Sequence, residues 1–121
     1  MDDYQIETLL SHYAEEREKY SGAVNMPIFQ NSLFVFPDWD SISKAFEDPV
    51  NSCIYTRGKN PSVHVTEKKI ARLAFGEKAK LFSSGMGAIS SAILHFIKSG
   101  DHVITIKNIY RPSNIFLNTY L

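Results

Sequence analysis

A run of small residues between two apolar segments has the composition of an anion-binding turn. Residues 83–88 read Ser-Ser-Gly-Met-Gly-Ala, and they follow a short apolar run, residues 79–82, that is typical of a strand. Apolar residues recur at helical spacing after them, so the run stands where a strand turns into a helix. The first amides of a helix have no partner within it and face outward with the positive end of the helix dipole. The sequence therefore predicts an anion site at residues 83–88, here named the anion cradle.

A glycine turn with a serine cap and no ligand explains the same residues about equally well. Three more specific motifs do not match. No lysine followed by serine or threonine comes after the glycines, as a Walker motif requires. Gly85, Gly87 and Ser90 give G-x-G-x-x-S, which lacks the last glycine or alanine of the dinucleotide fingerprint. Neither serine has the flanking glycines of a hydrolase nucleophile elbow, so the phosphate of some other cofactor remains as the candidate ligand.

Metal and thiol chemistry find little support in the sequence. The four histidines have no ligand spacing and no cysteine cluster beside them, so we expect no metal site. Cys53 is the only cysteine, which excludes an internal disulfide, and packing within a loop explains it. Lys107 follows a predicted strand, and a solvated lysine is the preferred interpretation of it.

Composition and charge are those of an ordinary folded protein. Thirteen basic and thirteen acidic side chains give a formal net charge of zero, which favours neither nucleic acid nor an anionic membrane as a partner. The chain is 44% hydrophobic and 21% charged, too apolar for a disordered protein. No apolar run approaches the roughly 20 residues of a membrane span, and the first residues do not resemble a signal peptide. We expect a cytoplasmic chain that forms one domain or part of one.

Residues 1–60 predict an amino-terminal helix and an extended arm. Helical spacing over residues 3–20, with Asp2 and Asp3 ahead, indicates one helix. Residues 21–37, here named the arm, hold glycine and prolines around apolar residues without a sustained period, which favours extended backbone. A short helix is expected from residue 40 or 41 to residue 47, followed by a loop over residues 51–61.

Residues 61–121 alternate between helix and strand. We expect a helix from Pro61 to a stop at Gly76 and a strand at 79–82, then a helix whose buried face runs from Met86 to Ile97 and that Gly100 ends. A strand at 102–106 and a helix opening at Pro112 follow. The two strands should be parallel, with a right-handed crossover, so the predicted fold class is α/β. The last helix is expected to be still running at Leu121, so the chain is expected to be truncated.

Three separated segments resemble one enzyme family. Residues 81–86, followed by Gly-Asp-His-Val at 100–103 and by Tyr110, are similar to its cofactor-phosphate segment. Residues 55–62 resemble its Y-S-R-x-x-N-P-T segment, and residues 27–36 resemble its P-I-Y-Q-T-S-T-F-V-F arm. The matches cover about residues 22–121 in order, which is far more specific than one glycine turn. The chain thus resembles the pyridoxal 5'-phosphate (PLP) enzymes of cysteine and methionine metabolism, the cystathionine γ-synthase, cystathionine γ-lyase and methionine γ-lyase group.

The resemblance implies a cofactor, a fold and roles for particular residues. Ser84, Gly85 and Met86 would bind the PLP phosphate, and Tyr110 would stack on the pyridine ring as the catalytic candidate. Tyr55 and Arg57 would reach the phosphate of a neighbouring subunit. A core or interface tyrosine and an exposed loop cation are the alternative interpretations of these side chains. The implied fold is an arm followed by the first part of an aminotransferase-like, fold type I large domain.

The family's pattern is not matched everywhere. After Tyr110 the family usually has glycines or a cysteine, whereas this chain has Arg-Pro-Ser, which leaves the substrate subclass open and weighs against methionine γ-lyase. The lysine that holds PLP covalently and the domain that binds the substrate carboxylate are expected beyond Leu121. The resemblance implies the amino-terminal part of an enzyme that catalyses β- or γ-elimination or replacement on a sulfur-containing amino acid. The 121-residue chain by itself is expected to be inactive.

Two other functions stay open. The chain could be a non-catalytic fragment that only folds, self-associates or binds anions, or a small nucleotide-binding domain. Self-association is expected because the arm carries six large apolar side chains, whose exposure would cost several kcal/mol at about 25 cal/mol per Å². In the family that the chain resembles, the arm crosses to a neighbouring subunit. We therefore expect a dimer, or a tetramer built from two dimers, with a shared cofactor site.

Overall fold

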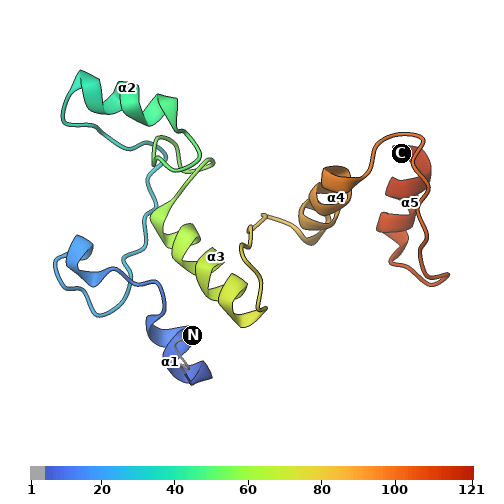
Figure 1. The fold of residues 1–121 in the computed structure, drawn as a ribbon, viewed down its shortest axis with the longest axis horizontal. Helices are drawn as coiled ribbons and strands as arrows, with labels where there is room; N and C mark the ends of the chain where they lie inside the picture. The colour runs from blue at the N-terminus through green and yellow to red at the C-terminus, as the bar shows by residue number, and fades with distance from the viewer. Residues whose placement is uncertain (1–4) are drawn as a thin grey trace. The chain divides into compact units, whose positions relative to one another are not determined.

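The computed structural model describes residues 5–121, which form two compact units. The first unit runs up to Ala79 and the second is Lys80–Leu121. In the first unit lie α1 (Ile6–His12), the 3-10 helix η1 (Arg17–Tyr20), α2 (Trp39–Glu47) and α3 (Pro61–Leu73). The second unit holds α4 (Gly85–Phe96) and α5 (Arg111–Thr119), as Figure 1 shows.

The amino-terminal helix is shorter than the sequence predicts. The single helix expected over residues 3–20 is wrong, because α1 ends at His12 and η1 begins only at Arg17. Between them Ala14 has a φ of 62°, a left-handed conformation that a right-handed helix cannot include. Asp2 and Asp3, the acids expected at the helix start, lie outside the described residues.

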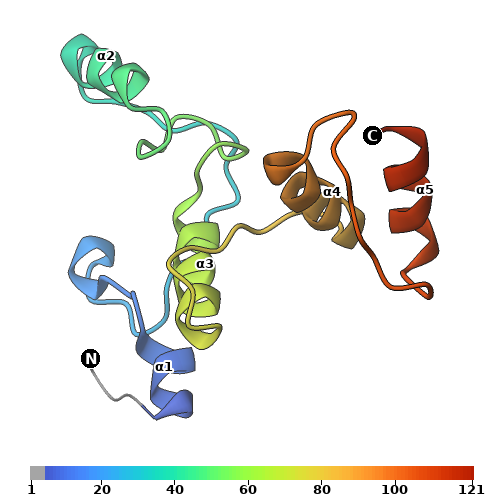
Figure 2. The same ribbon diagram turned by 45° about the vertical axis from the view of Figure 1, so that its right-hand side comes forward.

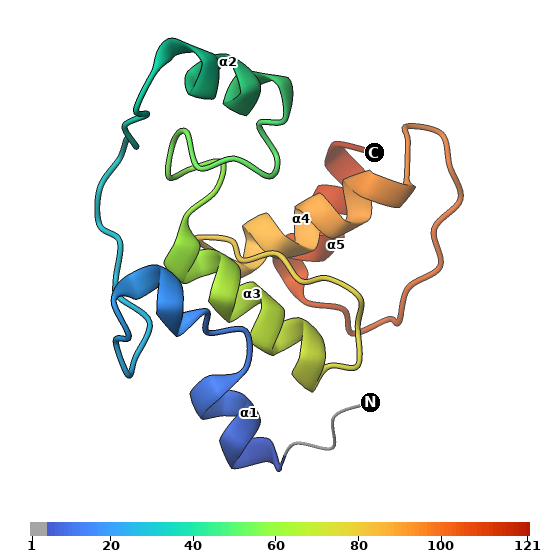
Figure 3. The same cartoon turned by 60° about the vertical axis from the view of Figure 1, so that its left-hand side comes forward.

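α3 is the element on which the first unit is built. The Asn60 side chain accepts a hydrogen bond from the Ser62 amide at 2.9 Å, and Pro61 occupies the first helical position, so the helix begins where the sequence predicts. α1 packs against α3, as Figure 3 shows. The Lys69 ammonium of α3 fixes this contact by donating to the Leu10 carbonyl oxygen at 2.8 Å.

The arm is hydrogen-bonded to the start of α3. The Phe29 amide donates to Ser62 Oγ at 2.9 Å, and the Asn60 side-chain amide donates to the Phe29 carbonyl oxygen at 2.9 Å. Ser62 Oγ in turn donates to the Pro27 carbonyl oxygen at 2.9 Å. Residues 21–37 contain no helix, and the backbone of the arm is held by its own chain.

A second set of contacts joins the end of the arm to the loop before α3. Leu33 and Tyr55 form an antiparallel β-bridge, and the Thr56 amide donates to the Ser32 carbonyl oxygen at 2.9 Å. The side chains beyond this pairing stay outside: Val35 is 98% exposed. The arm therefore satisfies its backbone locally and leaves much of its apolar surface uncovered.

The two helices of the second unit run in the same direction. Near their starts Ser113 Oγ lies 3.9 Å from Met86 Sδ, and near their ends Ser99 Oγ donates to the Leu121 carbonyl oxygen at 3.2 Å. Figures 1 and 2 show the same parallel course. α5 runs to Thr119, and Tyr120 keeps right-handed helical backbone and donates to the Phe116 carbonyl oxygen at 3.0 Å, so helical geometry reaches the residue before Leu121.

The two predicted strands are not formed within residues 5–121, where no strand occurs. Residues 79–82 and 102–106 are irregular, and the second segment lies on the return path from the end of α4 to the start of α5. A strand requires ladder hydrogen bonds to a neighbouring strand, and an isolated pair has marginal stability in water. The α/β class is therefore not observed in the described residues, which are helices joined by irregular segments.

Little apolar surface is buried in either unit. Among the described residues only a few hydrophobic side chains are buried, and two of them are alanines: Leu9, Ala45, Val65 and Ala71. Larger side chains such as Phe96, which is 81% exposed, remain at the surface. Helix caps and side-chain hydrogen bonds, more than a large core, define the local geometry.

Candidate cofactor-phosphate site

The start of α4 presents two free amides. Ser84 has extended backbone, its Oγ accepts a hydrogen bond from the Gly87 amide at 3.0 Å, and its carbonyl oxygen accepts from the Ala88 amide at 3.1 Å. The amides of Gly85 and Met86 have no hydrogen-bond partner among the described residues. Since the dipole of a twelve-residue helix adds positive potential here, both N–H groups can donate to an anion.

The anion cradle is open at Gly85 and tightly packed at Gly87. A Cβ placed on Gly85 would meet nothing within 4 Å, whereas one on Gly87 would lie 3.0 Å from Ser84 Oγ and crowd the cap. The first turn of α4 carries no acidic residue that would repel an anion. The Ser84 hydroxyl accepts from Gly87 and keeps its own hydrogen for another acceptor. Two amides and a hydroxyl on one open turn are a donor set that fits the oxygens of a phosphate group.

Tyr110 lies at the start of the neighbouring helix. It immediately precedes Arg111, its carbonyl oxygen accepts from the Asn114 amide at 3.1 Å, and the residue is 62% exposed. The contact between Ser113 and Met86 brings the first turn of α5 against the first turn of α4. Tyr110 and the anion cradle therefore occupy the same end of two parallel helices.

Tyr55 and Arg57 lie together in the first unit. The guanidinium carbon of Arg57 is 5.0 Å from the centroid of the Tyr55 ring, a cation–π contact. The Tyr55 carbonyl oxygen accepts from the amides of Gly58 and Lys59 at 2.9 and 3.1 Å, which makes the turn that holds both side chains. The predicted site residues thus form two groups, this pair in the first unit and Ser84, Gly85, Met86 and Tyr110 in the second.

Ser113 is a contributor that sequence reasoning did not find. It is 3% exposed, and it is the residue through which the start of α5 contacts Met86. The sequence showed only a small residue after Pro112 in the first turn of a helix. Nothing in that local pattern names a partner in a distant part of the chain.

Neither a metal centre nor a membrane span is found among the described residues. No group of three or more histidine, cysteine, aspartate or glutamate side chains among residues 5–121 is arranged to hold a metal ion. Within the same range, every helix is too short or too polar to cross a bilayer.

Comparison with known proteins identifies the family. The sequence model of the family described as Cys/Met metabolism PLP-dependent enzyme matches residues 7–121. An L-methionine gamma-lyase of Fusobacterium nucleatum subsp. polymorphum is 42% identical over 107 residues, which are 88% of this chain and 27% of that protein. The O-acetyl-L-homoserine sulfhydrylase of Corynebacterium glutamicum is 34% identical over 90% of this chain and 25% of that protein. A homocysteine synthase of Schizosaccharomyces pombe is 31% identical over 91% of this chain and 26% of that protein.

The chain spans about a quarter of the length of these relatives. The family match nevertheless runs from α1 through Tyr55, Arg57 and the anion cradle to Leu121, so it includes every residue group described above. This chain belongs to the family of Cys/Met metabolism PLP-dependent enzymes.

Proposed function

We propose that this chain is the amino-terminal part of a PLP-dependent enzyme of sulfur amino-acid metabolism, and that the anion cradle holds the cofactor phosphate. The observation that carries the proposal is the pair of free amides, Gly85 and Met86, at the capped start of α4 in a chain of a PLP-dependent family. When bound, PLP supplies an electron sink for the substrate. The chain itself binds the phosphate and orients the ring.

Tyr110 is proposed as the residue that stacks on the cofactor ring. Its exposure and its position at the end of α5 nearest to the anion cradle support this role. Stacking of one aromatic ring on another adds about 0.5 to 1.5 kcal/mol beyond the burial of area. The contact fixes the plane of the pyridine ring, while the phosphate fixes its distance from α4.

Tyr55 and Arg57 are proposed to bind the phosphate of a second copy of the chain. The β-bridge between Leu33 and Tyr55 makes the arm and this pair one piece, so docking the exposed arm on another subunit carries both side chains with it. Arginine offers a forked pair of charge-assisted hydrogen bonds to a phosphate. The proposed assembly is a symmetric dimer, or a tetramer of two dimers, with shared cofactor sites.

The proposed reaction is elimination or replacement at the β or γ carbon of a sulfur-containing amino acid. The relatives' names include a lyase, a sulfhydrylase and a synthase, so they support the reaction group and not one member. The missing cysteine gives no reason to set methionine γ-lyase aside, because the F. nucleatum lyase is more similar to this chain than the sulfhydrylase is, at 42% against 34% identity.

An α/β, fold type I domain is proposed for the whole protein, which we place in the cytoplasm. Two parallel helices joined by a returning segment, as α4 and α5 are, form the usual arrangement around a parallel strand. Residues 79–82 and 102–106 then become strands when neighbouring strands supply their hydrogen bonds. The domain begins at residue 61, where α3 starts, after the helix and arm of residues 1–60.

Cofactor content and activity of the whole protein test this function. The purified protein should retain PLP and release thiol or sulfide from a sulfur amino acid. Gly85→Val and Arg57→Ala should each lower the PLP retained after dialysis, whereas Lys44→Ala, at an exposed position of α2, should not. A protein that binds no PLP, or that binds it equally in all four forms, would show that the proposed site is wrong.

A further inference from the structure

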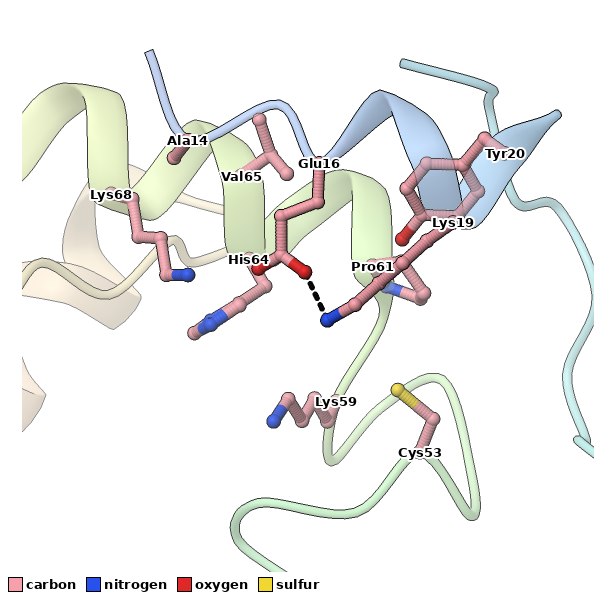
Figure 4. A pocket seen from close by; sticks show the side chains of 10 residues that line it. All are labelled: Ala14, Glu16, Lys19, Tyr20, Cys53, Lys59, Pro61, His64, Val65 and Lys68. Atoms are coloured by element: carbon pink, nitrogen blue, oxygen red, sulfur yellow. Dashed lines mark ion pairs between the residues drawn. The ribbon is translucent and has the colours of Figure 1, made fainter. Parts of the chain in front are cut away.

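A cavity of about 230 Å³ lies in the first unit, apart from every residue assigned above. η1 and the residues before it, the loop before α3 and one face of α3 line it, as Figure 4 shows. Sites for drug-sized ligands usually measure about 300 to 1,000 Å³, so this cavity suits a smaller molecule.

Three lysines from three segments line this cavity. Lys19 comes from η1, Lys59 from the loop and Lys68 from α3, and Glu16 is the only carboxylate among the lining residues. Figure 4 shows the three ammonium groups and the His64 ring directed into the same space. Three positive charges against one negative charge leave the cavity with a positive excess.

Glu16 neutralises only one of these lysines. It forms an ion pair with Lys19, and this partner, by hydrogen bond and then by charge, lowers the pKa of Glu16, with smaller effects from the charges of Lys68 and His64. The Lys59 ammonium donates to the Asn51 carbonyl oxygen at 2.5 Å, which leaves two of its three hydrogens available. Lys68 has no hydrogen bond or ion pair with another described residue. Two ammonium groups at the cavity therefore lack a carboxylate partner.

We propose that this cavity binds a small phosphate-bearing dianion, with Lys59 and Lys68 as its principal ligands. Like charges that face one space repel each other, and a dianion between them removes that repulsion. A phosphate carries about 1.5 to 2 negative charges near neutral pH, which matches the two unpaired ammonium groups. Lysine binds phosphate as a point charge, so several flexible lysines can share one ion.

Cys53 provides a direct reporter of occupancy. Its side chain lines the cavity, and it is the only cysteine of the chain, so alkylation reports on this place alone. The rate of reaction with neutral iodoacetamide is measured on the 121-residue chain with increasing inorganic phosphate, at an ionic strength held constant with sodium chloride. The same titration is repeated with glycerol phosphate, which distinguishes a site for free phosphate from one that admits a phosphate ester.

The proposal predicts a saturable decrease in the alkylation rate of at least about threefold, which corresponds to two-thirds occupancy. Lys59→Gln and Lys68→Gln should each abolish the protection, and Lys68→Arg should keep it. In Lys44→Gln, which removes a lysine outside the cavity, phosphate should protect Cys53 as well as it does in the unaltered chain. Gly85→Val should also keep the protection, because the anion cradle lies in the other unit. Circular dichroism shows whether each variant is folded.

Three results would overturn the proposal. These are no protection by either phosphate at high concentration, protection by chloride alone, or equal protection in the Lys44, Lys59 and Lys68 variants. The lysines lie on surface elements, so their replacement by glutamine is not expected to unfold the chain. Lys68→Arg keeps the positive charge and changes the side chain, so protection in this variant shows that the charge at this position is what binds phosphate.

Discussion

The Asn60 side chain donates a hydrogen bond to the carbonyl oxygen of Phe29 and accepts one from the amide of Ser62, each at 2.9 Å. One residue, only 4% exposed, therefore fixes the arm and caps α3 at the same time. Because Tyr55 and Arg57 lie in the segment between these two contacts, their position depends on Asn60.

Replacement of Asn60 tests this double role. Asn60→Ala removes the cap and leaves the Phe29 carbonyl oxygen without its donor, so the free energy of unfolding should fall by about 1 to 3 kcal/mol. Asn60→Asp keeps the cap, so its free energy of unfolding should fall by less. Urea unfolding followed by circular dichroism measures both, with exposed Asn51→Ala as the control. An Asn60→Ala chain as stable as the Asn51→Ala control would show that neither bond matters.

The pairing of Lys69 with Glu15 provides a second test. Their nitrogen and oxygen are 2.7 Å apart, with side chains only 16% and 6% exposed, and this pair joins the segment after α1 to α3. Lys69→Ala leaves the buried Glu15 carboxylate with only its longer pair to Arg17, at 3.8 Å, and should cost about 3 kcal/mol of unfolding free energy. The double variant Lys69→Met with Glu15→Gln should cost less, since no charge remains buried. The neighbouring Lys68→Ala is the matched control, and an equal loss there would contradict the account.

The acid dependence of α2 follows from its cap. Hydrogen bonds from the side chain and then the backbone of Ser41 lower the pKa of Asp38 below its ordinary value of 3.8. A carboxyl with a lowered pKa in the folded state contributes stability that is complete above 3.8 and is lost as the pH falls through the folded value. The protection of the Ser41 and Ile42 amides against exchange, relative to the intrinsic rate at each pH, should therefore fall below that range. Asp38→Asn, which caps without titrating, should remove this acid step, and an unchanged step in that variant would refute the assignment.

The local signals of helix starts were readable in the sequence, and the long-range contacts were not. Asn60 before Pro61 and Ser84 before a glycine turn mark caps that depend only on adjacent residues, so α3 and α4 begin where expected. The strands expected at 79–82 and 102–106 do not form among residues 5–121, because a strand depends on hydrogen bonds to a neighbour that the local pattern does not contain. The break at Ala14 was equally hidden, since the spacing on both sides of it is helical.

The cap of α4 links stability to cofactor affinity. Ser84→Ala removes the hydrogen bond to the Gly87 amide and should cost about 1 kcal/mol, which is about fivefold in the affinity of the whole protein for PLP if the helix start must be ordered to bind it. Ser91→Ala, on the exposed middle of α4, is the matched control and should change affinity little. Fluorescence titration with PLP compares the two. Equal affinities of the two variants for PLP would show that the Ser84 cap does not contribute to PLP binding.

A crystal structure of the PLP-loaded whole protein tests the central claim most directly. The account predicts phosphate oxygens about 3 Å from the amide nitrogens of Gly85 and Met86, the Tyr110 ring over the pyridine ring, and Arg57 reaching the phosphate from a second copy. A phosphate bound away from the start of α4, with the Gly85 and Met86 amides turned to other partners, would contradict it.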